Sequence, residues 1–364
     1  SHSAEPRFNM LQTVHEYALE KLEQSDDALE TKLRYADYFL ELCKTASEHA
    51  WWAYGESWLD KLEYEYQNIR SAFYLFIENK EYEKAWDLFY YMVVYWIIRG
   101  GFSEGLKWIE DAGIMKLEFQ DSVTIDAETR GRTLTWAALV QLMLMRIEEG
   151  YTLLHKAEAI LKETVNRRDY AFAIMFDGCY GAFLGFPDAA TKIEEARELC
   201  ERLNEPLPLT MFYVWGYEYY RQQNQMDLVT KHFERAQTIA SELGITYILG
   251  ALYIQQFSLD VMNPENDWEK TAREALAMRK LLPEKGYKGL KSAAMNAYAF
   301  SMLMQGRLDD VYLPLMKALE FARECGEKES EFYGIMLASG YFKAIHNNEK
   351  AYTLFGMLDA FLEG

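Results

Sequence analysis

Six alanines recur along this chain at nearly even intervals. They are Ala112, Ala157, Ala196, Ala236, Ala275 and Ala318, with successive gaps of 45, 39, 40, 39 and 43 residues. Each lies on or near the second of two amphipathic segments that are separated by a short break. A period of about 35–45 residues is typical of a helical solenoid, in which hairpins stack and bury a continuous core. The sequence therefore predicts stacked helical hairpins with an extended curved surface, which suits binding or sensing better than catalysis.

The unit that ends at Ala236 shows why this spacing suits paired helices. Tyr220 precedes a polar turn at 223–225, and Phe233 and Ala236 follow on the second helix. Two helices approach closely only where a small side chain lies at their crossing, and a nearby aromatic ring fills the adjacent space. Corresponding turns are predicted near 149–150, 185–187, 263–264, 306 and 347–348, and core positions at Tyr180, Tyr220, Phe233 and Phe355.

The composition favours an all-α chain and argues against some partners. The 364 residues include only 7 prolines, and no Gly/Ser-rich linker is visible. A formal net charge of −19 would repel a phosphate backbone, so we expect no direct binding of nucleic acid. The one basic stretch, at 279–291, is interpreted as a solvated loop between hairpins.

Cysteine usage and missing motifs bear on compartment and cofactors. The four cysteines, Cys43, Cys179, Cys200 and Cys325, show no C-x-x-C spacing, which predicts a reduced, cytoplasmic setting without a zinc site. The sequence has no signal peptide and no apolar run of about 18 residues, so we expect no membrane partner. It also lacks a G-x-x-x-x-G-K-[ST] loop, and we predict no cofactor.

Local motifs that suggest catalysis have simpler structural explanations. Residues 101–105 match the G-x-S-x-G nucleophile motif, but a helical run precedes them where a strand is required, and Ser103 is interpreted as a helix N-cap. Acidic pairs such as Glu194 and Glu198 are expected by chance among 57 acidic residues. Isolated histidines are expected at the surface or at helix ends, namely His49, His155, His232 and His346.

The repeat units resemble tetratricopeptide repeats. In the unit that ends at Ala236, Tyr217, Tyr220 and Phe233 occupy slots of that family's pattern, although the spacing here is 39 to 45 residues, longer than the family's roughly 34. The resemblance implies a right-handed superhelix in which the first helix of each hairpin lines a concave wall.

The same resemblance selects side chains that would face the concave groove. They are Glu218, Arg221, Gln222, Tyr253, Phe257, Asp260, Asn296, Phe300, Tyr333 and Lys343. Polar groups beside aromatic rings suit a peptide, a protein segment or a small polar ligand such as a sugar. The alternative is a solvated wall that holds no ligand.

The first third of the chain carries a more specific resemblance. The segments FNMLQTVHEYA at 8–18, WLDKLE at 58–63 and NIRSA at 68–72 resemble the junction between the winged helix and the repeats in bacterial signal-transducing NTPases of the STAND type. That group includes transcriptional regulators of the LuxR and maltose-regulator type. The resemblance implies that an intact protein carries covalently linked nucleotide-binding and winged-helix domains, with this chain as the sensor.

These observations predict three segments. Residues 1–7 are interpreted as a disordered start, in which Ser1-His2-Ser3 resembles the cleavage scar of an expression tag. Residues 8–65 are expected to form linker helices from the winged helix to the repeats, with the part up to about Leu42 as the coupling element. Residues 66–364 are expected to form the repeat array.

The leading functional hypothesis is a ligand- or protein-binding sensor that regulates a linked nucleotide-switch domain in a signalling or transcription-regulating ATPase. Binding would act by shifting the population of conformations, and the chain itself is predicted not to be an enzyme. A passive protein–protein scaffold is the alternative. A helical-toroid glycosidase is a more remote one, because it needs two carboxylates that converge in a deep pocket.

Overall fold

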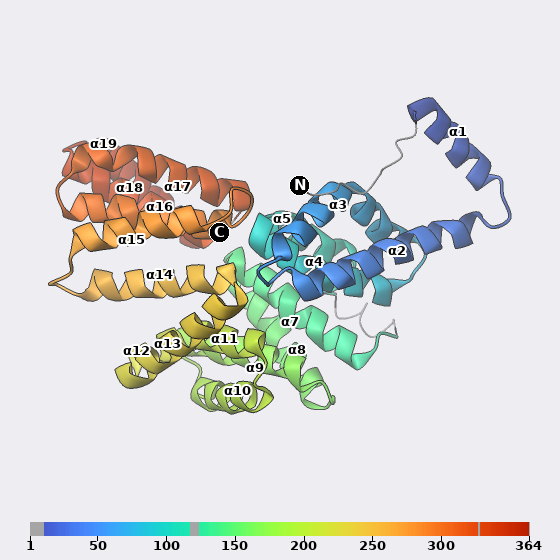
Figure 1. Ribbon diagram of the computed structural model, residues 1–364, viewed down its shortest axis with the longest axis horizontal. Coiled ribbons are helices and arrows are strands. Elements are labelled where there is room, and N and C mark those ends of the chain that lie inside the picture. The colour runs from blue at the N-terminus through green and yellow to red at the C-terminus, as the bar shows by residue number, and fades with distance from the viewer. Residues whose placement is uncertain (1–10, 117–123, 327, 364) are drawn as a thin grey trace.

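The computed structural model describes residues 11–116, 124–326 and 328–363, and these residues form helices with no strand among them (Figure 1). The predicted tag scar and Phe8–Met10 at the start of the predicted linker lie outside the described residues. The first helices are α1 (Gln12–Glu23), α2 (Ala28–His49), α3 (Gly55–Glu78), α4 (Tyr82–Arg99) and α5 (Phe102–Asp111). The predicted boundary at residue 65 lies within α3.

The middle of the chain continues the pattern of paired helices. Its helices are α7 (Ala127–Met143), α8 (Ile147–Lys162), α9 (Arg167–Leu184), α10 (Ala189–Leu203), α11 (Pro206–Trp215), α12 (Tyr217–Gln222) and α13 (Met226–Leu243). In the hairpin of α11 and α12 with α13, the first helix is interrupted at Gly216. Consecutive hairpins stack on one another, so each buries a face that it could not bury alone.

The last third comprises three more hairpins. Its helices are α14 (Thr246–Met262), α15 (Trp268–Leu281), α16 (Lys288–Met304), the 3₁₀ turn η1 (Leu308–Asp310), α17 (Tyr312–Cys325), α18 (Lys328–Ala344) and α19 (Asn348–Glu363). Figure 1 shows these helices gathered at one end of the molecule, with α1 standing away from the other end. The all-α prediction is confirmed.

The six periodic alanines are buried as predicted. Each is 0% exposed, and the small side chain lets a neighbouring helix approach. The turns predicted at 185–187, 223–225, 263–264 and 306 fall between helices, and 347–348 marks the junction of α18 and α19. Tyr220 is fully buried, and Tyr180 and Phe233 are partly buried.

Two packing predictions are wrong. Gly150 does not lie in a turn but in the first turn of α8, where a Cβ atom would lie 2.7 Å from the Leu142 side chain. This glycine therefore marks a close helix crossing. Phe355 is 59% exposed, because it lies on α19 and no later helix covers it in the described part of the chain.

The interpretation of Ser103 as an N-cap is also wrong. Helix α5 already begins at Phe102, and Gly101 occupies the cap position with φ of 126°. The preceding residues belong to helix α4, so the strand that the G-x-S-x-G motif needs is absent from this place. Gly100 and Gly101 shape the turn because both adopt positive φ angles, which side chains disfavour.

Two histidines depart from the expectation that they are isolated surface residues. His232 on α13 is 4% exposed and stacks on Tyr213 at 4.6 Å between ring centroids. Burial lowers its pKa to about 4. The imidazole of His155 lies 3.1 Å from the Asp177 carboxylate through its Nδ1 atom.

The basic stretch at 279–291 was interpreted as a solvated loop, but two of its lysines bind other parts of the fold. Lys291 lies within α16, is 1% exposed and donates to the backbone oxygen of Glu284 at 2.6 Å. Lys285 crosses to the first third of the chain, where its ammonium lies 3.4 Å from Asp60 and 3.7 Å from Glu63.

The array returns on itself, which the repeat pattern does not predict. We call this contact the seam: residues 53–63 and 98–101 on one side meet 243–244, 285–287 and Cys325 on the other. The amide of Ala53 donates to Leu243 at 3.3 Å, that of Gly101 to Cys325 at 3.3 Å, and that of Tyr287 to Ile98.

Arg99 is the most buried charge at the seam. Its side chain is 5% exposed and lies 3.1 Å from Glu56, 2.9 Å from Asp60 and 3.8 Å from Glu63. Gly286 packs against it so closely that a Cβ atom there would lie 2.9 Å from the Arg99 guanidinium. The buried guanidinium is therefore compensated by a cluster of carboxylates.

Enlarging a periodic alanine should weaken the fold. We expect Ala196→Leu to lower the free energy of unfolding by about 1–3 kcal/mol through overpacking. Ala190→Leu is the matched control, because Ala190 lies on the same helix but is exposed, and it should change stability by less than about 0.5 kcal/mol. Urea unfolding measures both, and equal effects would contradict the packing role of Ala196.

His232 should make the protein less stable in mild acid. Its pKa is depressed in the fold, so its contribution is present above the unfolded pKa of about 6.5 and is lost as the pH falls towards 4. The loss should reach roughly 3 kcal/mol. His232→Phe keeps a ring beside Tyr213 and should show a flatter stability profile between these pH values. If the free energies of unfolding of wild type and variant fell in parallel as the pH decreased, protonation of His232 would not be the cause of the acid sensitivity.

Candidate functional site

The predicted groove residues on α12 mostly contact one another. Arg221 forms an ion pair with Glu218, and Gln222 donates to the same carboxylate at 2.9 Å. The Arg221 guanidinium also contacts the Met262 sulfur at 3.1 Å, which links α12 to the end of α14. Bonding with Arg221 lowers the pKa of the Glu218 carboxyl.

The predicted residues on α14 and α16 contact one another through one pair of aromatic rings. The rings of Phe257 and Phe300 meet edge to face at 5.9 Å between centroids. The Asp260 carboxylate accepts from the Thr271 hydroxyl at 3.0 Å, and the Tyr253 hydroxyl is buried without a hydrogen-bond partner. Asn296 is 9% exposed, because Gly334 of α18 packs over its side chain, so it does not present an open polar surface.

The two predicted residues on α18 differ in their surroundings. Lys343 is exposed near the end of the helix. Tyr333 is accessible, yet burial raises its pKa, as do the nearby charges of Glu329 and Glu218. The structure thus brings Glu218 and Tyr333, which are 115 positions apart in sequence, close enough for the Glu218 charge to raise the Tyr333 pKa.

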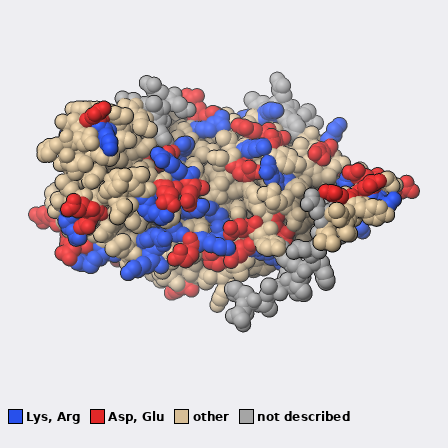
Figure 2. All heavy atoms as spheres, turned by 90° about the horizontal axis from the view of Figure 1, so that it is seen from above, with Lys and Arg blue, Asp and Glu red and all other residues tan. Residues whose placement is uncertain are grey.

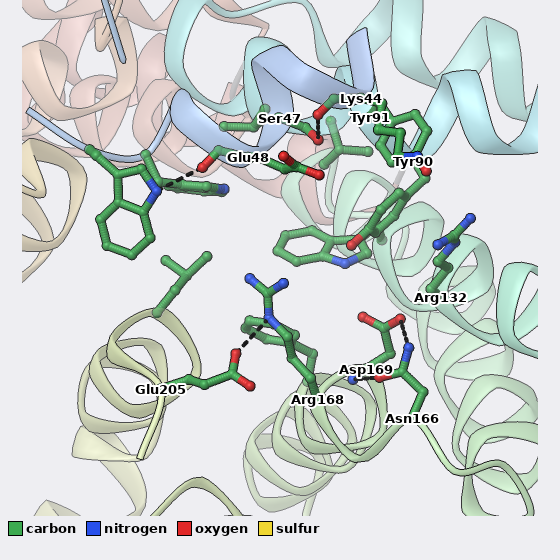
Figure 3. Close-up of a pocket in the computed structure, with 17 residues that line it drawn as sticks. Lys44, Ser47, Glu48, Tyr90, Tyr91, Arg132, Asn166, Arg168, Asp169 and Glu205 are labelled. Carbon is green, nitrogen blue, oxygen red and sulfur yellow. Dashed lines mark hydrogen bonds and ion pairs between the residues drawn. The ribbon is translucent and has the colours of Figure 1, made fainter. Parts of the chain in front are cut away.

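A cavity lies elsewhere in the fold, at a place that the repeat periodicity did not indicate, and none of the predicted groove residues lines it. It has a volume of about 470 Å³ and is lined by the end of α2 together with α4, α7, α9 and α11 (Figure 3). We call it the α2–α9 pocket. Its walls combine aromatic and charged side chains: Trp51, Trp136 and Phe172 are among the rings that line it, and the last two have ring centroids 5.3 Å apart.

Arg132 on α7 is fixed at one side of this pocket. Its guanidinium lies 2.5 Å from the Asp87 carboxylate and over the rings of Tyr90 and Tyr91, at 4.8 and 5.7 Å from their centroids. The Asp87 charge and hydrogen bond outweigh the effect of burial and raise the Arg132 pKa. This guanidinium therefore stays charged and already has partners.

Asp169 is held at the start of α9 by a reciprocal cap. The Asn166 side chain accepts from the Asp169 amide at 3.1 Å and donates to the Asp169 carboxylate at 2.9 Å. Asp169 is 5% exposed, and burial raises its pKa, while Arg132 and Arg168 act to lower it. The cap thus places a buried carboxylate on the pocket wall.

Two opposite charges face each other across the opening. Figure 3 shows Arg168 on α9 and Glu48 on α2 pointing into the space from opposite walls. The Nε atom of Arg168 lies 3.2 Å from Glu205, which leaves the outer nitrogens directed towards the cavity. The arrangement can receive a ligand that carries both an anionic and a cationic group.

The sequence contained a signal for this pocket that periodicity did not reveal. In the sequence, residues 169–178 are almost entirely apolar except for the carboxylates of Asp169 and Asp177. In the structure, all ten of these residues are buried on α9. A charge inside a helix buried on every side needs a specific partner. The walls from α2 and α4 lie outside the repeat register and carried no such signal.

One group of side chains in the described part of the chain has the composition of a metal site. His155, Glu158 and Asp177 approach one another on α8 and α9. The Lys192 ammonium, however, lies 2.9 Å from Glu158 and 2.9 Å from Asp177. Lysine already supplies the cation here, so the group does not suggest a metal centre.

None of the helices described in the structure is both long and apolar enough to cross a lipid bilayer. No protein-family model matches the chain. Three curated relatives, provisionally named HTH-type transcriptional regulators, come from Mycobacterium bovis and two strains of Mycobacterium tuberculosis. Each is 25% identical over 213 residues, which is 57% of this chain but only 24% of the relative.

Two solved structures show a distant likeness. One is aspartyl phosphate phosphatase F from Bacillus subtilis, with a TM-score of 0.44 and 12% identity over 98% of this chain and 76% of that chain. The other is a STAND protein with a tetratricopeptide repeat sensor from Pyrococcus horikoshii, with a TM-score of 0.44 and 12% identity over 96% and 54%. The chain is thus an all-helical repeat protein, similar over somewhat more than half its length to part of HTH-type regulators.

Proposed function

We propose that this chain is the ligand-sensing repeat module of a larger bacterial regulator, and that its ligand occupies the α2–α9 pocket. The opposed charges of Arg168 and Glu48 on aromatic walls are the observation that carries this proposal. The similarity to HTH-type transcriptional regulators supports the regulatory context. The regulated partner would be a covalently linked nucleotide-switch domain, as the resemblance at 8–72 implies.

The chemistry of the pocket favours a short peptide over an uncharged ligand. A carboxylate would pair with Arg168, an amino group would pair with Glu48, and apolar side chains would pack on Trp51 and Trp136. The volume of about 470 Å³ falls within the range of small-molecule sites. A sugar could stack on the same rings but would leave the two charges unpaired.

Ligand binding would act on the shape of the array. The pocket walls come from α2 and α4 on one side and from α9 and α11 on the other, which are far apart in sequence. A ligand that contacts both sides stabilises the arrangement in which they are close and so shifts the population of conformations. Helix α2 overlaps the predicted coupling element, which extends from residue 8 to about Leu42, and would transmit this change.

A protein-binding scaffold is the second candidate, because apolar side chains are exposed on the last hairpins. Leu313 on α17 and Tyr352 on α19 are each 76% exposed. Figure 2 shows few charges at the upper left of the molecule, on the side where the C-terminal helices lie, and interspersed acidic and basic side chains over the lower left and the middle. The glycosidase alternative is weaker, since Asn166 engages Asp169 and Arg168 engages Glu205.

Screening short peptides and sugars by thermal shift tests the sensor proposal. A peptide at about 100 times its dissociation constant should add about 2.7 kcal/mol to the free energy of unfolding. Calorimetric titration with that peptide should show at least a tenfold loss of affinity for Arg168→Gln. Arg202→Gln is the matched control, because Arg202 is exposed on α10 away from the pocket, and it should bind normally.

Two outcomes would contradict the proposal. In the first, no peptide or sugar changes the melting temperature of the wild-type protein. In the second, Arg168→Gln binds the selected ligand as tightly as wild type does. Specific capture of a protein by a chain that binds no small molecule would instead support the scaffold.

A further inference from the structure

A second, smaller cavity lies where the two ends of the array meet. It has a volume of about 160 Å³, and its walls come from α4, α5, α7, α11, α14, α16, α17 and α18. We call it the seam cavity. This volume is well above what a single water molecule needs, so the cavity has room for a small organic group.

The seam cavity combines aromatic walls with one charged side chain. Trp215, Tyr247 and Tyr287 line it together with aliphatic residues such as Leu139 and Ile254. Glu329, in the first turn of α18, is the one charged residue among those that line it. An electron-rich aromatic lining and a carboxylate both attract a cation.

Glu329 lies where the seam cavity meets solvent, because it lines the cavity and is also exposed. The protein packed around its carboxyl nevertheless raises the pKa of this group through desolvation. The carboxylate therefore carries a desolvation cost that a bound cation would offset.

The neighbouring cations form ion pairs elsewhere. Arg323 and Lys328 both bind the Glu331 carboxylate, at 3.0 Å each. Arg99, behind Tyr287, is surrounded by the three carboxylates of the seam. Arg99, Arg323 and Lys328 thus each have carboxylate partners other than Glu329.

We propose that the seam cavity binds a small organic cation, an alkylammonium of about the size of choline. The aromatic rings would contact its methyl or methylene groups, and Glu329 would supply the counter-charge. An anion would be repelled by Glu329, and an uncharged apolar ligand would leave this carboxylate without compensation. The bound cation would also contact both sides of the seam and hold it closed.

Titration calorimetry of the whole chain with choline and with tetramethylammonium tests this site. Wild type should bind one cation per chain in a saturable manner, with quenching or enhancement of tryptophan fluorescence from Trp215. Glu329→Gln, which keeps the shape of the side chain, should weaken binding at least tenfold. Dimethylbutanol, the uncharged isostere of choline, should bind wild type at least tenfold more weakly, and this comparison needs no variant.

Two controls separate this site from the rest of the molecule. Glu349→Gln removes an exposed carboxylate from α19 and should leave binding unchanged. Arg168→Gln should also leave the binding of ammonium ligands unchanged. The test of the seam cavity therefore holds even if the α2–α9 pocket binds no ligand. The proposal is overturned if wild type binds neither ammonium saturably, if Glu329→Gln binds normally, or if dimethylbutanol binds as well as choline does.

Discussion

The closed shape of this molecule depends on the burial of Arg99 against a cluster of carboxylates. The Arg99 guanidinium donates to Asp60 at 2.9 Å and lies within ion-pair distance of Glu56 and Glu63, at 3.1 and 3.8 Å. Gly286 leaves space for this contact. Gly100 similarly allows Cys325 to approach, because a Cβ atom at Gly100 would lie 2.9 Å from the Cα atom of Cys325. Arg99 is the buried member of this cluster, so removing its carboxylates would leave a buried charge without compensation.

Both cavities bring together helices that are distant in sequence. The α2–α9 pocket has walls from α2 and α4 on one side and from α9 and α11 on the other. The seam cavity has walls from α4 and α5 on one side and from α14, α16 and α18 on the other. A ligand in either place would contact segments that are distant in sequence, which is the requirement for converting binding into a change of shape.

The sequence predicted the parts of this structure that depend on local packing. The alanine period predicted which helices pair, because a small residue is needed at each crossing. The turn at 149–150, the core position of Phe355 and the N-cap at Ser103 were wrong. It did not predict the seam, since Lys285 and Asp60 are 225 positions apart and nothing in the repeat couples them. The α2–α9 pocket was missed for the same reason: its opposing charges, Glu48 and Arg168, come from a helix outside the repeat register and from one within it.

The distance across the seam in solution tests the central claim most directly. Spin labels at Tyr54→Cys and Ser241→Cys would lie beside the hydrogen bond from Ala53 to Leu243 and on exposed positions. Labelled wild type controls for reaction of Cys179, the one native cysteine that is not fully buried. Pulsed electron resonance should give one short, narrow distance if the array is closed. A long or broad distribution, as expected from an open solenoid with separated ends, would contradict the account.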